Sequence, residues 1–192
     1  MKEVMKMEKK FVPQIKEIEN SVFWMEFGNN SRIELKNSSF GIGKVAIGLQ
    51  KFDDNNRQIA YVTTYLDFDK ALVLANDILS GRFMKMAEQK NSDTMVTLYK
   101  QPGGQSAEKA NREDGKPLYR EFSISKGKLW ILSAQEGPGQ ISKTGGFMPD
   151  GKYDTKVNVG LSNDSLKAFA IMIQQEYNAY RTAQYMKLVM EK

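Results

Sequence analysis

The order in which hydrophobic periods follow one another constrains this chain most. Between Ser21 and Asp67 four runs alternate apolar and polar residues, which predicts β-strands, and the next run, "FDKALVLANDILSG", has the period of a helix. After residue 94 four strand-like runs again precede a helical run, "NDSLKAFAIMIQQEYNAYRTAQYMKLVMEK". The order predicts an α+β protein made of two ββββα repeats, residues 21–82 and 94–192.

The two repeats also share a short residue pattern. The string "GKVAI" from Gly43 matches "GKLWI" from Gly127 at an offset of 84 residues (127 − 43), whereas the strand-to-helix junctions at Leu66 and Leu161 are 95 apart. The difference of 11 residues (95 − 84) predicts an insertion in the glycine- and lysine-rich segment 136–156. A chain of 192 residues is long enough for one shared core, so we expect residues 21–192 to form a single domain.

Capping residues support both predicted helices. Asp67 suits the N-cap of the first helix, Gly81 suits a left-handed residue at its end, and Ser162 suits the N-cap of the second. The residues expected to face the core are Ala71, Leu74, Ala75 and Ile78 in the first helix, and Leu166, Phe169, Ala170, Ile173 and Tyr177 in the second.

The composition removes several classes of function. The chain has no cysteine and no histidine, which excludes disulfides, thiolate or imidazole metal sites and the commonest general base. The carboxylate pairs Asp53–Asp54 and Glu113–Asp114 occur in loop contexts rather than as catalytic dyads, so we expect neither an enzyme nor a cofactor. No run is long and apolar enough for a membrane span or a signal peptide, so we expect a cytoplasmic protein.

The charge favours a polyanionic partner. The net charge is +5, and lysine far outnumbers arginine, the usual bidentate reader of guanine edges. This bias indicates binding that depends on charge and tolerates different sequences. Residues 1–20 are expected to form a separate basic arm that is mobile or partly helical.

The run "GKVAIGLQKF" poses a question about its outward face. Val45, Ile47 and Leu49 are expected to point inward, which leaves small residues such as Gly48 beside Lys44 on the other face. A face that receives bases and phosphates must allow a close approach, and aromatic rings would stack on the bases. The residues expected to bind nucleic acid are Lys44, Gln50, Phe52, Arg57, Tyr61, Tyr65, Tyr119, Lys126, Lys128, Trp130, Lys143 and Lys152.

Each of these residues also has a structural interpretation. Trp130, expected on the outward face with Lys128, could instead belong to the core or to a contact between subunits. Lys44 and Lys128 could simply solvate an open sheet face. Their equivalent placement in the two repeats favours the functional interpretation. Of Tyr119 and Arg120, which take opposite faces, Tyr119 is the one expected on the binding face.

The duplicated unit, with a Gly-Lys-apolar signal at the second strand that rests on "GIGKVAI" and "KGKLWIL", resembles the Whirly-like family of single-stranded-DNA-binding proteins, which includes transcriptional-coactivator and guide-RNA-binding relatives. The resemblance covers residues 21–180 by the order of elements. It implies two antiparallel sheets with helices packed on one side, single strands held by the other face, and a homo-oligomer, often a tetramer.

The leading hypothesis is therefore a single-stranded-DNA-binding protein with weak sequence preference, acting in replication, recombination, transfer or transcription in a bacterium or a mobile element. A second hypothesis keeps the fold and changes the ligand to RNA. A third is a self-assembling scaffold protein that binds no nucleic acid and whose outward aromatic residues contact other subunits.

Overall fold

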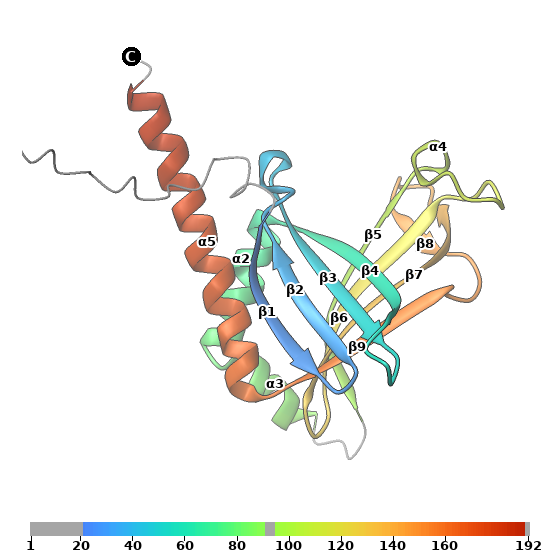
Figure 1. Cartoon of the computed structure of the whole chain (residues 1–192), viewed down its shortest axis with the longest axis horizontal. Helices are drawn as coiled ribbons and strands as arrows, with labels where there is room; N and C mark the ends of the chain where they lie inside the picture. Colours follow the sequence, from blue (N-terminus) through green and yellow to red (C-terminus); the bar gives the residue numbers. More distant parts are fainter. Residues whose placement is uncertain (1–20, 91–94, 191–192) are drawn as a thin grey trace, which may run out of the picture.

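The computed structural model describes residues 21–90 and 95–190, so the expected basic arm at 1–20 lies outside the described residues. Its strands form two antiparallel sheets (Figure 1). Sheet A has the order β1-β2-β3-β4, with β1 (Val22–Gly28), β2 (Ser31–Lys36), β3 (Lys44–Phe52) and β4 (Gln58–Asp67). Sheet B contains β5 (Val96–Gln105), β6 (Leu118–Lys126), β7 (Trp130–Ile141), β8 (Phe147–Pro149) and β9 (Thr155–Leu161), and both β8 and β9 pair with β7.

The longer helices gather on one side of the sheets, as Figure 1 shows. They are α2 (Phe68–Leu79), α3 (Arg82–Gln89) and the long α5 (Asn163–Met190). A 3-10 turn, η1 (Phe40–Ile42), precedes β3, and a single helical turn, α4 (Ala107–Ala110), lies at the far end of sheet B. The predicted α+β class is confirmed. Within the described residues, no helix combines the length and apolar character that crossing a bilayer requires.

The core lies between the inner faces of the two sheets and under the helices. Strand β9 crosses sheet A and contacts all four of its strands, which joins the two sheets into one body. Val45, Ile47 and Leu49 are fully buried, as their alternation predicts. The other large apolar groups of this core are Ile33, Leu35, Val62, Leu66, Phe122, Ile124, Leu132, Val157, Val159 and Leu161. Burial of this apolar surface drives the packing of the sheets.

Both predicted helices form where their caps indicate. Asp67 occupies the N-cap of α2, and Gly81 follows the end of this helix with a φ of 76°, in the left-handed region that glycine adopts without strain. The backbone N–H of Ser165 donates to Oγ of Ser162 over 3.0 Å, which caps α5. The predicted core residues of both helices are buried, except Tyr177, which is half-buried and packs on Phe68.

Three segments differ from the expectation. Helix α3 begins directly after Gly81, where the sequence indicated the end of the repeat. Strand β5 continues through "QPGGQ", although proline and glycine are typical of turns; Pro102 is tolerated because β5 is an edge strand. The predicted insertion in the second half contains β8, which pairs with the far end of β7.

The expected outward position of Trp130 is wrong. Its side chain is 1% exposed and packs on Phe83 of α3, and its indole N–H donates to the Oδ1 of Asn163 over 2.7 Å. The two GK strings do not occupy equivalent positions, because Lys44 begins β3 whereas Lys128 lies in the turn before β7. The inward residues of the two strands are therefore offset by 85 (130 − 45) instead of 84, and a slip of one residue exchanges the two faces of a strand.

We predict that Trp130→Ala lowers the free energy of unfolding by about 3–5 kcal/mol. The change leaves a cavity beneath α3 and removes the donor to the Oδ1 of Asn163. Urea unfolding followed by circular dichroism measures the change. Ile59→Ala, at a side chain that is 57% exposed, is the control and is expected to change stability by less than about 0.5 kcal/mol. A loss for Trp130→Ala no larger than that of the control would contradict the buried position.

Candidate functional site

The outer face of sheet A carries the side chains that the sequence placed there. Gln50 on β3 lies opposite Tyr61 on β4, and Ala46 lies opposite Tyr65. Lys44 begins the same row on β3, and Phe52 ends it. The five residues predicted for this face, Lys44, Gln50, Phe52, Tyr61 and Tyr65, are thus all found on it. Their contacts decide which of them can meet a ligand.

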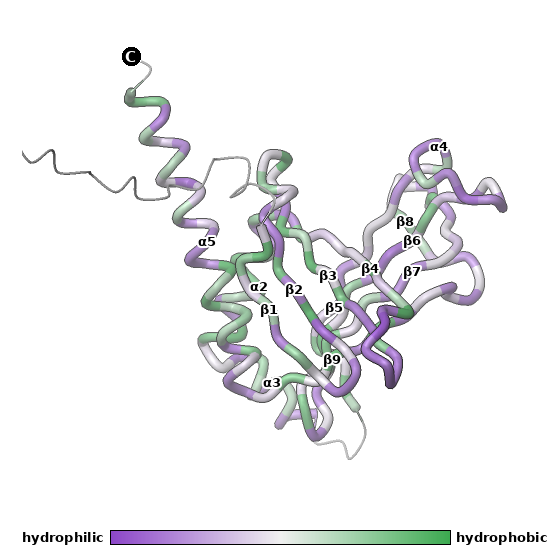
Figure 2. The backbone as a smooth tube through the Cα atoms, in the orientation of Figure 1, coloured by the Kyte–Doolittle hydropathy of each residue, from purple (hydrophilic) through white to green (hydrophobic). Residues whose placement is uncertain are grey.

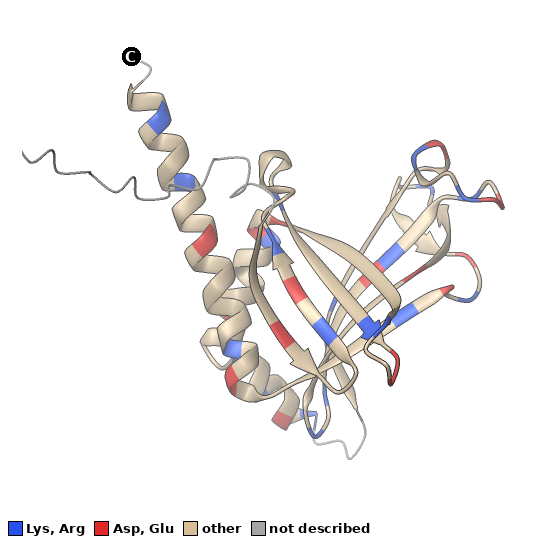
Figure 3. Ribbon diagram, viewed as in Figure 1, with Lys and Arg blue, Asp and Glu red and all other residues tan. Residues whose placement is uncertain are grey.

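The centre of this face is occupied by the buried carboxylate of Glu34. Its side chain is 3% exposed, and its Oε1 accepts from Lys36 Nζ at 2.6 Å and from Gln50 Nε2 and Tyr61 Oη, each at 3.1 Å. The guanidinium of Arg32 lies 3.6 Å from its Oε2. The outward residues of β2 are therefore a basic, an acidic and a basic one, Arg32, Glu34 and Lys36 (Figure 3). A buried charge needs such partners to offset its desolvation. The sequence analysis did not single out Glu34, because its alternation with Ile33 and Leu35 is that of an ordinary residue on the outward face of a strand.

This network explains why β3 has a glycine, Gly48, in the middle of its outer face. A Cβ atom at Gly48 would lie 2.7 Å from Tyr61 Oη and 2.8 Å from Glu34 Oε1, closer than such atoms approach. Gly48 therefore makes room for the protein's own carboxylate and phenol. Partial burial lowers the pKa of Lys36, but the hydrogen bonds to Glu34 and Tyr61 more than offset this, so its pKa lies above the ordinary value.

Sheet B repeats the arrangement on its own outer face. Glu121, which is 8% exposed, accepts from Tyr119 Oη and Gln135 Nε2, each at 2.9 Å, and Lys100 Nζ lies 3.6 Å away. Each sheet therefore has a carboxylate bonded to one Tyr, one Gln and one Lys side chain. Burial, and then the bond to Glu121, raises the pKa of Tyr119 far above its ordinary value.

The predicted role of Tyr119 as an exposed stacking ring does not agree with this placement. Its side chain is 4% exposed and is covered by Tyr153, whose ring centre lies 6.1 Å away. It does lie on the outer face, opposite to that of Arg120, as its alternation indicates. The centres of both outer faces are thus closed by hydrogen-bonded side chains.

The sheets part at the end remote from α3, and an open cleft of about 700 Å³ lies between them. It runs between β4, the edge strand of sheet A, and β5, the edge strand of sheet B. Its charged lining consists of Lys44, Lys70, Lys109, Arg120 and Asp67, so four cations face one carboxylate. Tyr65, which is 40% exposed, and Phe147 add one aromatic ring from each sheet.

The cleft opens because the inner face of sheet B becomes polar. Phe122 and Ala134 form a fully buried apolar pair of β6 and β7. The next pair on that face is Arg120 and Glu136, which are joined by an ion pair of 2.9 Å and precede Leu118 and Pro138. Charged groups on that face gain nothing from contact with the apolar inner face of sheet A. The sheets therefore pack tightly over the apolar part only.

Asp67 draws two of the cleft's lysines together. Its Oδ1 lies against Lys44 Nζ, and its Oδ2 lies 3.1 Å from Lys70 Nζ. Hydrogen bonds from Lys44 and Lys70 lower the pKa of Asp67. Two cations share one anion, so this corner of the cleft keeps a net positive charge at neutral pH.

Only Lys44 and Tyr65 of the predicted binding residues line this cleft. Phe52 and Arg57 lie at the opposite end of sheet A, in the hairpin between β3 and β4. There the guanidinium carbon of Arg32 lies 5.8 Å from the ring centre of Phe52. Lys126 donates to the carbonyl of Gly127, within the turn that also holds Lys128. Lys143 and Lys152 lie in the loops on either side of β8, outside the cleft lining.

The sequence analysis missed four basic or aromatic residues of the cleft, namely Lys70, Lys109, Arg120 and Phe147. Arg120 was missed because the sequence analysis expected Tyr119 on the binding face instead. Lys70 was detectable in principle, because it lies one turn after the N-cap residue Asp67. Lys109 and Phe147 come from a loop and an insertion whose positions depend on the pairing of β5, β7 and β8. A search of the described residues, 21–90 and 95–190, finds no group of acidic side chains suited to hold a metal ion.

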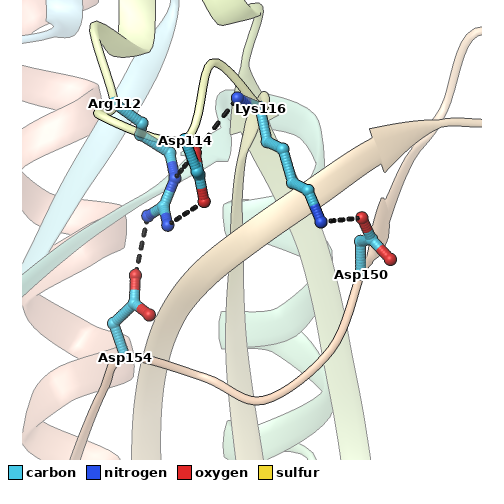
Figure 4. Close-up of polar contacts among 5 residues, drawn as sticks. All are labelled: Arg112, Asp114, Lys116, Asp150 and Asp154. Atoms are coloured by element: carbon cyan, nitrogen blue, oxygen red, sulfur yellow. Dashed lines mark hydrogen bonds and ion pairs between the residues drawn. The ribbon is translucent and has the colours of Figure 1, made fainter.

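Ion pairs join the loop after β5 to the loop before β9 (Figure 4). Arg112 contacts Asp114 at 2.8 Å and Asp154 at 2.7 Å, and Lys116 contacts Asp150 at 2.7 Å. The bond from Arg112 lowers the pKa of Asp114 to about 2. These five residues, which we call the loop clamp, hold the segment that carries Lys109.

Comparison of the chain with models of protein families, with curated proteins and with solved structures finds no match.

We predict that Glu34→Ala lowers the free energy of unfolding by about 3 kcal/mol, because it leaves Lys36, Gln50 and Tyr61 without their shared acceptor. Chemical denaturation measures the effect. Glu113→Ala, in an exposed loop, is the control and is expected to leave stability unchanged. Equal stability of the two variants would show that Glu34 is not a structural residue.

The loop clamp is expected to persist in mild acid. Because the pKa of Asp114 is lowered in the folded chain, its contribution is complete above about pH 4 and is lost as the pH falls through about 2. Asp114→Asn should remove it at neutral pH and accelerate amide hydrogen exchange in residues 107–117. Glu113→Gln is the matched control, and the same acceleration in both variants would contradict the assignment.

Proposed function

We propose that this protein binds single-stranded DNA with weak sequence preference, and that the strand lies in the cleft between sheet A and sheet B. The observation that carries the proposal is the cleft's lining, in which four cations face one carboxylate and each sheet contributes one aromatic ring. The proposal involves no catalysis and no cofactor. In this proposal the binding surface is the cleft, and not the outer faces of the sheets that the sequence suggested.

The cleft supplies both interactions that unpaired nucleic acid requires. Lys70 and Lys109 have exposed side chains that can approach phosphates, and Lys44 shares its charge with Asp67. Tyr65 and Phe147 offer ring faces to bases, a contact worth about 1–3 kcal/mol per base for any base type. A duplex hides these base faces inside its stack, so the rings favour single strands.

Weak sequence preference agrees with the kind of cation present. Three of the four basic groups are lysines, which act as point charges, and Arg120 is engaged by Glu136 at 2.9 Å. Bidentate reading of guanine needs a free guanidinium, and none lines the cleft apart from this paired one. Charge and stacking therefore dominate the expected recognition.

A Whirly-like duplication and assembly into a homo-oligomer belong to the same proposal. Each half of the chain has its strands before its longer helices, and each outer face has a Glu bonded to Tyr, Gln and Lys. These similarities support a duplication. Light scattering of the purified protein tests the oligomeric state.

We predict that Lys70→Ala combined with Lys109→Ala weakens binding to a fluorescent oligo-dT and flattens its dependence on salt. The slope of log K against log [salt] should fall by about 1.4, which is about 0.7 for each of two phosphates. The matched control is Lys51→Ala with Lys85→Ala, which removes two exposed lysines outside the cleft. An equal effect of both double variants would exclude the cleft, and tighter binding of oligo-U would favour RNA.

We also predict that Tyr65→Ala and Phe147→Ala each weaken binding by about 1–3 kcal/mol with little change in the salt slope, because stacking releases no counterions. Fluorescence anisotropy at several salt concentrations measures both quantities. Tyr185→Ala, which removes an exposed ring from α5, serves as the control. Unchanged affinity in both cleft variants would show that neither ring contacts a base.

A further inference from the structure

The tripeptide Asp-Gly-Lys occurs twice in this chain, and both copies contribute to the loop clamp. The first begins at Asp114, in the loop between α4 and β6, and the second begins at Asp150, in the loop between β8 and β9. Figure 2 shows the loop after α4 as mostly hydrophilic chain, which is typical of a segment in contact with water. Aspartate followed by glycine is prone to rearrange into isoaspartate, because glycine has no side chain to hinder attack by its own backbone nitrogen.

Isoaspartate forms through a cyclic imide, in two steps that need only water. In the first step, the backbone nitrogen of the glycine attacks Cγ of the protonated aspartate side chain. An N–C bond forms, and the hydroxyl of the acid leaves with the proton of the nitrogen as one water molecule. In the second step, a water molecule opens the ring, and opening at the backbone carbonyl leaves the main chain running through the former side chain. The side chain and the next backbone nitrogen must therefore be free to meet.

Exposure and space do not distinguish the two copies. The side chains of Asp114 and Asp150 are 36% and 41% exposed. A Cβ atom added at Gly115 or at Gly151 would meet nothing within 4 Å among the described residues beyond its chain neighbours. Both glycines also have a positive φ. A difference in reactivity must therefore come from hydrogen bonds.

At the first copy both reacting groups are held. Oδ1 of Asp114 accepts from the backbone N–H of Lys116 and from Nε of Arg112, each at 3.0 Å, and its Oδ2 accepts from Nη2 of Arg112 at 2.8 Å (Figure 4). The backbone N–H of Gly115 donates to the carbonyl of Arg112 over 3.0 Å. The bond from Arg112 also lowers the pKa of Asp114 to about 2, so the protonated acid that the attack requires is scarce.

At the second copy the reacting groups are much less restrained. Nζ of Lys116 donates to Oδ2 of Asp150 over 2.7 Å, and Oδ1 accepts no hydrogen bond from the described residues. The backbone N–H of Gly151 likewise has no acceptor among residues 21–90 and 95–190. The one partner, Lys116, is carried on a flexible stem that can follow the carboxyl group as it turns.

We propose that Asp150–Gly151 is a site of isoaspartate formation in the folded protein, and that Asp114–Gly115 is protected from the same reaction. The product has one more methylene group in the main chain, and its carboxylate is attached directly to Cα. The 2.7 Å contact with Lys116 is then lost, and the pair of Arg112 with Asp154 is what still joins the two loops of the loop clamp. The modification does not depend on nucleic-acid binding.

Storage of the purified protein in neutral buffer at physiological temperature tests the proposal. Peptide mapping measures isoaspartate at each copy, because the rearranged peptide elutes separately at unchanged mass. We expect the rate at Asp150 to exceed the rate at Asp114 by at least about tenfold, because more hydrogen bonds must break at Asp114. Equal rates at the two copies, or a faster rate at Asp114, would overturn the proposal.

The chain unfolded in concentrated urea is the matched reference. The hydrogen bonds of the loop clamp are absent there, and both copies have the same tripeptide, so the two rates should converge. A difference that persists unchanged in urea would assign the rates to the flanking sequence instead of the fold, and would overturn the proposed protection of Asp114.

Asp150→Glu gives a second, independent test. Glutamate keeps the charge that pairs with Lys116, but its side chain would have to close a larger ring, which forms far more slowly. After the same storage, the isoaspartyl fraction of the wild-type protein should exchange its amides at 113–117 severalfold faster than before, whereas stored Asp150→Glu should not change. The same exchange in both stored proteins would overturn the proposed loss of the Lys116 contact.

Discussion

The packing of two sheets over a core shorter than their strands determines the form of this protein. Where Phe122 and Ala134 face sheet A, the sheets are held together by buried apolar surface. Two residues further along, Arg120 and Glu136 occupy the same face, and the sheets separate. The cleft is the direct result of this change from apolar to charged residues. Its lining is then set by what the edge strands and the nearby loops present.

The outer faces follow a different physical rule. Each contains a carboxylate, Glu34 or Glu121, that is nearly sealed from water and satisfied by Tyr, Gln and Lys side chains. Such groups are costly to bury alone and tolerable once every acceptor is used. They occupy the space that a bare strand otherwise offers to a ligand. Lys70 and Lys109 of the cleft, by contrast, remain exposed.

Local patterns were sufficient to predict most strands and the helices α2 and α5, but not α3 or β8, and not how the elements pack together. The period of two identified the strands of sheet A and its inward residues Val45, Ile47 and Leu49, and the caps located α2 and α5. The position of Trp130 was wrong because equal strings were taken as equal positions, and a slip of one residue reverses the faces of a strand. The cleft was not predictable, because it is lined by β4, β5 and loops that come together only through long-range strand pairing.

The loop clamp gives the cleft a wall that responds to its surroundings. Lys109 belongs to the same excursion as Arg112, and that excursion is secured to the 150–154 segment by exposed ion pairs. Dissolved ions weaken such pairs in the same range of ionic strength in which they compete with a protein for the phosphates of nucleic acid. Under the proposed function, electrolyte therefore acts twice, once on the attraction itself and once on the rigidity of the scaffold that positions the attracting group.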